Sequence, residues 1–264
     1  MTKKSTAVAI PEGYSREDLI KLSGNIVSGS DEYLSGLVIN KEVEDRDGKD
    51  VPVPSFYVTY PEVGRVYSER KKPIEIRPFV KAMRYEKWLE QEKKAQCTTI
   101  FFSWGEEIID ELGGTDKLNK PNDDKVKCKH LIYCTVSFKG TTAEGKEVDV
   151  KDFPTLLRVG GASFGNVMDL FDELGDDRIL MQHPLIVDTY KSGPAYNFKL
   201  FWKDLTEELP ITAADWDTLQ NFRKEIDFFN KGITNKFKLA QKGSPAPEAT
   251  DDEGEYEYIE GEDD

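Results

Sequence analysis

The run from Lys125 to Lys139 alternates cleanly between two kinds of side chain, and this period of two predicts one long β-strand. The even positions predict a buried face, which consists of Val126, Cys128, His130, Ile132, Cys134, Val136 and Phe138. The odd positions predict a solvent-facing side of bases around one aromatic ring, and they include Lys125, Lys127, Lys129, Tyr133, Ser137 and Lys139. A strand of this length needs partner strands, so we expect the chain to be built on a β-sheet.

Shorter runs predict the partners of this strand. Strands are expected at residues 33–39, 55–60, 98–104, 146–150, 184–191 and 194–203, with the turn dipeptide Asp47-Gly48 after the first. Residues 74–88 fit a strand or a helix. Ser163 and Thr212 each precede an apolar run with helical spacing, so we expect them to cap two amphipathic helices.

The expected strands do not alternate regularly with helices, which argues against a doubly wound parallel sheet. The sequence therefore predicts an α+β or mostly β fold with mainly antiparallel strands, in the form of an OB-like barrel elaborated by helices. Three regions are expected: a basic arm at residues 1–12, a strand-rich body at 13–240 and a disordered acidic tail at 241–264.

Charge is concentrated in the tail. The chain has 50 acidic and 36 basic residues, a net charge of -14, and ten of the acids lie between Gly243 and Asp264 with no base among them. Without those ten the body has 40 acids against 36 bases. Such a segment is expected to be disordered because like charges repel and little apolar surface is available. It is either a solubilising tail or, as its apolar residues favour, a docking or self-inhibiting tail that uses Asp251, Asp252, Glu253, Tyr256, Tyr258, Ile259, Glu262, Asp263 and Asp264.

Familiar catalytic motifs are absent from the sequence. It has no Walker phosphate loop, no complete dinucleotide fingerprint, and neither the H-E-x-x-H nor the G-x-S-x-G motif. Cys128 and His130 point the same way on the expected strand and could share a zinc ion. Cys134 lies about 20 Å farther along an extended strand, too far for the same ion. We expect no metal and no cofactor, with these residues packed in the core.

Bases interleaved with aromatic residues recur in three segments. Besides the strand at 125–139, Lys199, Phe201 and Lys203 share one face of a strand whose other face carries Tyr196, Phe198, Leu200 and Trp202. If residues 77–87 are extended, they place on one side Arg77, Phe79, Lys81, Met83, Tyr85 and Lys87. Single-stranded nucleic acid needs this combination, because cations neutralise phosphates and aromatic faces stack the bases. The alternative is that these lysines only solvate a sheet.

A basic arm, a strand-rich body and an acidic C-terminus together resemble the replicative single-stranded-DNA-binding proteins of tailed phages and, more distantly, of bacteria. Lys3, Lys4, Ser5 and Thr6 look like the arm through which T-even phage relatives bind their neighbours, one base shorter. Those relatives carry a Cys3His zinc subdomain, whose residue types recur here at a different spacing. The resemblance implies that the tail binds replication or recombination proteins and competes with DNA for a cationic groove.

These observations favour a non-enzymatic protein that binds single-stranded DNA, self-associates along it and recruits replication, recombination or repair proteins through its tail. A phage structural or assembly accessory protein is the first alternative, and an enzyme with an unrecognised site is the second. No run approaches the roughly 18 apolar residues of a membrane span, and three cysteines make no disulfide framework. A cytoplasmic location, in the host cell if the protein is viral, is therefore expected.

Overall fold

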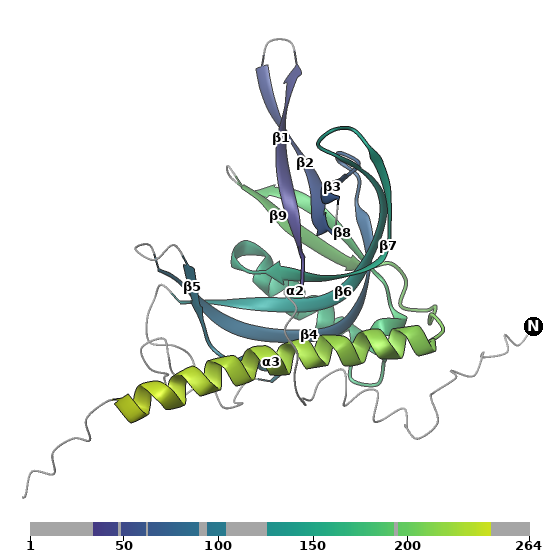
Figure 1. Cartoon of the computed structure of the whole chain (residues 1–264). Coiled ribbons are helices and arrows are strands. Elements are labelled where there is room, and N and C mark those ends of the chain that lie inside the picture. Colours follow the sequence, from purple (N-terminus) through teal and green to yellow (C-terminus); the bar gives the residue numbers. More distant parts are fainter. Residues whose placement is uncertain are drawn as a thin grey trace, which may run out of the picture.

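The computed structural model describes residues 34–46, 49–61, 63–89, 94–103, 126–192 and 195–243, which form a mostly β structure with two α-helices (Figure 1). The strands are β1 (Gly36–Arg46), β2 (Lys49–Tyr60), β3 (Gly64–Ser68), β4 (Ile74–Leu89), β5 (Lys94–Cys97), β6 (Lys127–Thr142), β7 (Glu147–Val159), β8 (Leu185–Ser192) and β9 (Ala195–Trp202). The helices are α2 (Phe164–Leu174) and α3 (Ala213–Gly243). The arm with Lys3, Lys4, Ser5 and Thr6, Lys125 and the tail residues beyond Gly243 lie outside the described residues.

Five strands close into a barrel. β1, β2, β3, β6 and β7 follow one another around it in chain order, and β7 returns to β1 through a parallel pairing that begins at Gly36 and Leu156. Closure between β3 and β6 requires Gly140, because a Cβ at this position would lie 2.5 Å from the carbonyl oxygen of Tyr67. The closed five-stranded barrel is compatible with the OB-like body that the sequence predicts.

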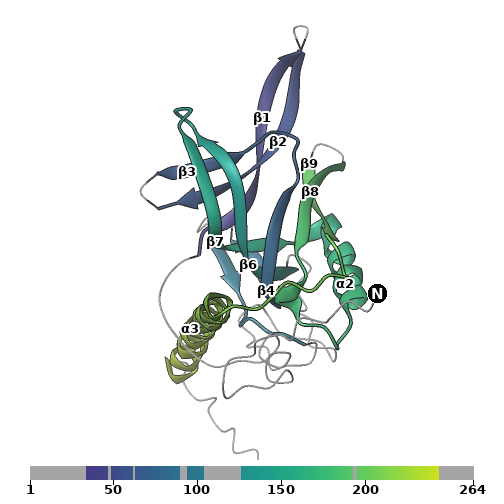
Figure 2. The ribbon, with the colours of Figure 1, turned by 90° about the vertical axis from the view of Figure 1, so that its right-hand side faces the viewer.

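The sheet continues beyond the barrel. β6 also pairs with β4, β4 with β5 and β8, and β8 with β9. Figure 2 shows β7, β6, β4 and the β8–β9 pair side by side in that order, while the β1–β2 hairpin projects past the barrel. Residues 74–88, which fitted a strand or a helix, form β4, and the strand pair expected at 184–203 is found. The strand expected at 98–104 is wrong, because among its described residues only Phe101 forms a bridge, with Met83 of β4.

Both faces of the extended sheet are covered over much of β4 and β6. One side, together with the barrel interior, packs against α2 and includes Val58, Ile132 and Leu157. The other side packs against α3, where Phe222 lies 5.7 Å from the rings of both Phe79 and Tyr133. Figure 1 shows α3 running beneath β4 and β6. The covered part of β4 and β6 therefore offers few side chains for a binding surface, and the exposed part of the extended sheet lies toward β9.

The hydrogen bonds at the N-termini of the two helices differ. The backbone N–H of Asp215 donates to Oγ1 of Thr212 at 3.2 Å, and the Asp215 carboxylate accepts from the N–H of Thr212 at 2.7 Å, so the expected cap of α3 is a reciprocal capping box. The expected cap at Ser163 is wrong: Ser163 precedes α2 without a side-chain cap, and its hydroxyl donates to the carbonyl of Phe198 at 2.8 Å. No helix within the described ranges combines the length and apolar character that a membrane crossing requires.

Candidate nucleic-acid interface

The clearest outward-facing group of predicted site residues lies on and just after β9. Phe201 is 41% exposed, Lys199 and Lys203 are exposed on either side of it, and Ile186 of β8 is its cross-strand neighbour. As the alternation predicts, Leu200 lies on the opposite face of the strand from Lys199 and Phe201 and is buried. We call the group of Ile186, Lys199, Phe201 and Lys203 the β9 face.

Two carboxylates lie beside the cations of the β9 face. Nζ of Lys203 is 2.6 Å from the carboxylate of Glu75, and both side chains are about half exposed at 54% and 43%. Lys199 is paired across the strands with Asp188. Exposed ion pairs contribute only about 0–1 kcal/mol, so a phosphate group can compete with either carboxylate for these lysines.

The other face of β9 explains why Phe201 cannot turn inward. Phe198 stacks on Phe56 of β2 at 6.3 Å between ring centroids, and the indole N–H of Trp202 donates to the carbonyl of Leu170 at 2.9 Å. These contacts fix the alternation of the strand, so Phe201 stays on the solvent side.

The predicted interface on β6 is wrong at its aromatic centre. Tyr133 is only 4% exposed and packs against Phe222, because α3 covers the odd-numbered face of the strand. Burial raises the pKa of the Tyr133 hydroxyl. Lys127 and Lys139 are exposed but lie at opposite ends of β6, about 40 Å apart along an extended strand. Lys129 is half-buried, and its aliphatic stem lies close to Gly160.

The predicted common face of residues 77–87 is also wrong, because a bulge between Pro78 and Val80 shifts the alternation of β4. Arg77 and Phe79 point toward α3, whereas Nζ of Lys81 lies 4.9 Å over the ring of Phe171 in α2. Phe79 and Tyr85 are buried at 1% and 5% exposure, so neither offers a ring face to a base. Lys87 is half-buried beside β5.

Arg77 has a structural role at the beginning of α3. Its guanidinium donates to the carboxylate of Asp215 at 2.7 Å and to the carbonyls of Met181 and Pro210 at 2.7 and 2.9 Å. A guanidinium with these three acceptors already ties three segments together. We therefore do not place Arg77 in a phosphate-binding surface.

A second outward-facing group was missed by the sequence analysis. Tyr57 of β2 and Tyr67 of β3 are cross-strand partners with ring centroids 5.6 Å apart, and the guanidinium of Arg65 lies 5.0 Å over Tyr57. Both rings are partly exposed, and Val38 of β1, paired with Tyr57, is 39% exposed. We call Arg65, Tyr57 and Tyr67 the tyrosine face. Alternation within 55–60 and 64–68 places these residues on one side, but only the pairing of the strands brings them together.

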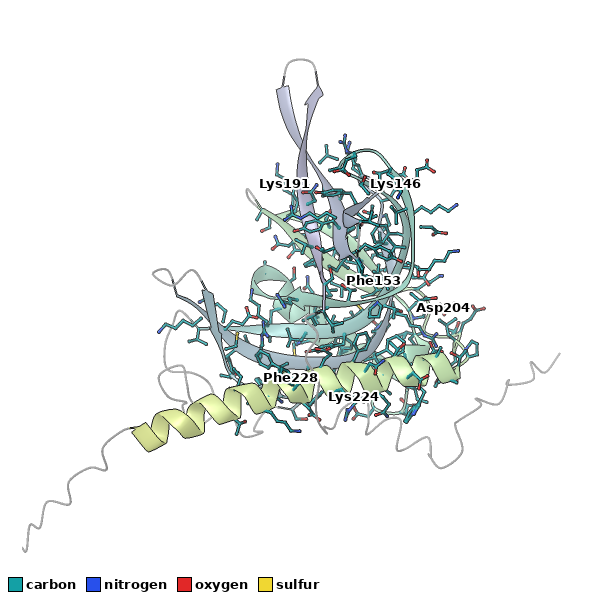
Figure 3. The ribbon with its side chains drawn as sticks, viewed as in Figure 1. Lys146, Phe153, Lys191, Asp204, Lys224 and Phe228 are labelled. Atoms are coloured by element: carbon teal, nitrogen blue, oxygen red, sulfur yellow. The ribbon has the colours of Figure 1, made fainter. Side chains whose placement is uncertain are left out.

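A broad hollow of about 1150 Å³ adjoins the tyrosine face. Tyr67, Arg70 and Lys139 line it, together with Glu147 and Asp149 of β7. Of the lysines predicted on β6, Lys139 is the one in the described chain that is both exposed and close to a partly exposed aromatic residue, Tyr67. Lys146, at the tip of the β6–β7 hairpin, and Lys191, at the end of β8, lie near this end of the molecule (Figure 3).

The cysteines and His130 are packed rather than clustered. Cys134 is fully buried and its thiol donates to the carbonyl of Thr155 at 3.7 Å, while burial raises the pKa of Cys128 to about 12. The ring of His130 stacks on Phe164 at 4.1 Å. Among the described residues, no three His, Cys, Asp or Glu side chains are grouped so as to hold a metal ion.

No protein-family model, curated protein or solved structure matches this chain. The function must therefore be argued from the outward-facing residues themselves.

Proposed function

We propose that this protein is a non-enzymatic single-stranded-DNA-binding protein with an OB-like barrel. The observation that carries the proposal is the β9 face, where the exposed ring of Phe201 lies between two exposed lysines, Lys199 in the strand and Lys203 just after it. An exposed phenyl ring can stack on an unpaired base, and the lysines can contact the phosphates on either side of it. A base paired within a duplex does not expose its ring face in this way.

The tyrosine face supports the same function. Two tyrosines and an arginine on the outside of a barrel supply flat rings together with a delocalised cation, and the hollow beside them contains Arg70 and Lys139. The bland alternative is that Tyr57 and Tyr67 only stabilise the strand pair, as cross-strand aromatic pairs do. Val38, 39% exposed in the same row, adds apolar area beside the two rings.

The acidic tail and the basic arm complete the proposal. The tail recruits replication or recombination proteins through Tyr256, Tyr258 and Ile259, and its acids compete with DNA for the exposed lysines. The arm mediates contact between neighbouring molecules on a long strand. Both roles rest on charge and composition and on the phage-protein resemblance.

The test compares full-length protein on a labelled poly-dT oligomer and on a duplex of equal length by fluorescence anisotropy, over a series of salt concentrations. We expect preferential binding to the single strand and an affinity that falls steeply with salt. Equal or absent binding to both would contradict the proposal. Defined large oligomers formed without nucleic acid would instead favour an assembly protein.

A further inference from the structure

The β9 face is connected to β6 by a row of directly opposite residues. Phe201 is opposite Ile186 of β8, and Ile186 is opposite Glu75 of β4. Glu75 is in turn opposite Ser137 of β6. Directly opposite residues of paired strands point to the same face of a sheet. The side of the sheet that carries Phe201 is therefore the side of β6 that carries Ser137.

The tyrosine face reaches β6 on the same side, two alternations farther along the strand. Tyr67 of β3 is opposite Thr141 of β6. Ser137, Lys139 and Thr141 are all exposed, and alternation places them on one face of β6. The β9 face and the tyrosine face thus lie on one side of a continuous sheet, with Lys139 between the rows that lead to them.

The turn between β3 and β4, residues 69–73, occupies the space between the two rows. β7 pairs along one edge of β6, so β3 and β4 follow one another along the other edge, joined by this turn. The turn carries three exposed bases, Arg70, Lys71 and Lys72, against the single acid Glu69, which lies 2.7 Å from Lys72. Arg70 lines the same hollow as Lys139 and Tyr67. The surface between the two aromatic groups is therefore basic.

β7 forms an acidic border to this surface. Glu147, Asp149 and Asp152 are exposed there. Asp149 is opposite Lys139, but its carboxylate lies 3.1 Å from the ammonium group of Lys151. Phosphate groups are repelled from a strand with this excess of acids, so they are favoured over Lys139 and the β3–β4 turn.

We propose that one single strand of DNA occupies both faces at once, with bases stacked on Phe201 and on Tyr67 and with the backbone between them in contact with Lys139 and Arg70. In a flat sheet, two strand spacings and four residues separate Phe201 from Tyr67, a distance of about 16 Å. At about 3.4 Å per stacked nucleotide, roughly five nucleotides span this distance. The inference rests on the proposed single-strand binding and adds that the two faces form one site.

Stoichiometry separates one site from two. The full chain is mixed with an excess of a poly-dT oligomer of about 12 nucleotides, which is long enough to span both faces, and the complexes are counted by native mass spectrometry. We expect one oligomer per chain at saturation. Two oligomers per chain would overturn the single site and leave the proposed function intact. No binding of the oligomer would overturn the proposed function, and the single site with it.

Variants at the two ends of the site test the same point. Phe201→Ala and Tyr67→Ala should each raise the Kd of this oligomer roughly 5- to 150-fold, because each removes one stacked base from the same complex. With two separate sites, loss of the weaker one would leave the measured Kd unchanged. An unchanged Kd in either folded variant would therefore overturn the proposal.

Lys139→Ala tests the connection between the two ends. It should reduce the slope of log K against log salt by about 0.7, the value for one lost phosphate contact. Lys224, exposed on α3 (Figure 3), supplies the matched control, and Lys224→Ala should leave the slope unchanged. Equal slopes for Lys139→Ala and the unmodified protein would show that the strand does not cross β6 at this residue and would overturn the proposed path.

Discussion

Replacement of Phe201 by alanine should weaken single-strand binding without affecting the fold. The ring is 41% exposed and its strand is held by the core contacts of its other face, so truncation leaves no cavity. Lys199 and Lys203 stay in place, so the variant removes stacking while the nearby cations are kept.

The expected loss follows from one stacked base. Stacking on an aromatic side chain contributes roughly 1–3 kcal/mol per base, which corresponds to a roughly 5- to 150-fold increase in Kd. Affinity for a labelled poly-dT oligomer is measured by anisotropy at several salt concentrations. The dependence of log K on log salt should keep its slope, because no phosphate contact has been removed.

Phe228 offers a matched control. It is the other strongly exposed phenylalanine among the described residues, at 37%, and Lys224 lies near it on α3 (Figure 3). The exposed lysines at positions 224 and 231 are both one helical turn away from it. Phe228→Ala should change the Kd by less than about twofold. Equal losses in both variants, or no loss in Phe201→Ala, would refute the assignment of stacking to the β9 face.

Four further predictions concern charge, the tail and stability. Lys199→Ala with Lys203→Ala should reduce the salt slope of poly-dT binding by up to about 1.4, or about 0.7 per lost phosphate contact; an unchanged slope would exclude these contacts. Removal of residues 244–264 should tighten binding at low salt, since a tethered anion competes at an effective concentration on the order of millimolar; equal affinity of both forms at the lowest salt would exclude this competition. Phe222→Ala should lower the free energy of unfolding by about 3–5 kcal/mol in urea titrations, because the ring is 1% exposed between the sheet and α3; a loss below about 1 kcal/mol would contradict this packing. Burial lowers the pKa of folded His130 from 6.5 to about 4, so between these pH values the unfolded chain binds more protons than the folded chain. Up to about 3 kcal/mol of the free energy of unfolding should therefore be lost as the pH falls through this window. In unfolding experiments at several pH values, His130→Phe should flatten this dependence.

Local pattern was sufficient to predict much of the fold. The period of two identified β6 and the β8–β9 pair, and Thr212 marked the beginning of α3. The same pattern also assigned Leu200 and Phe201 correctly to opposite faces. These features depend on residues close together in sequence, so a single sequence is enough to predict them.

The site was harder to predict because its exposure depends on distant segments. Alternation correctly separates Tyr133 from Ile132, but it cannot show that α3, about 90 positions later, covers the face of Tyr133. The bulge after Pro78 turns Lys81 to the face of the sheet opposite Phe79, although alternation places the two residues on the same face. The sequence around Pro78 does not specify this bulge. The tyrosine face requires knowledge that β2 pairs with β3, which brings Tyr57 opposite Tyr67.

Photo-crosslinking tests the central claim, that single-stranded DNA binds the outward-facing aromatic groups, most directly. A poly-dT oligomer that carries 5-iodo-deoxyuridine is bound to the full chain at low salt and irradiated, and the linked peptides are identified by mass spectrometry. We expect crosslinks at Phe201 and at Tyr57 or Tyr67. An excess of unlabelled poly-dT should abolish these crosslinks, whereas an excess of duplex DNA should not. Crosslinks confined to other segments, or none under conditions of saturated binding, would contradict the central claim.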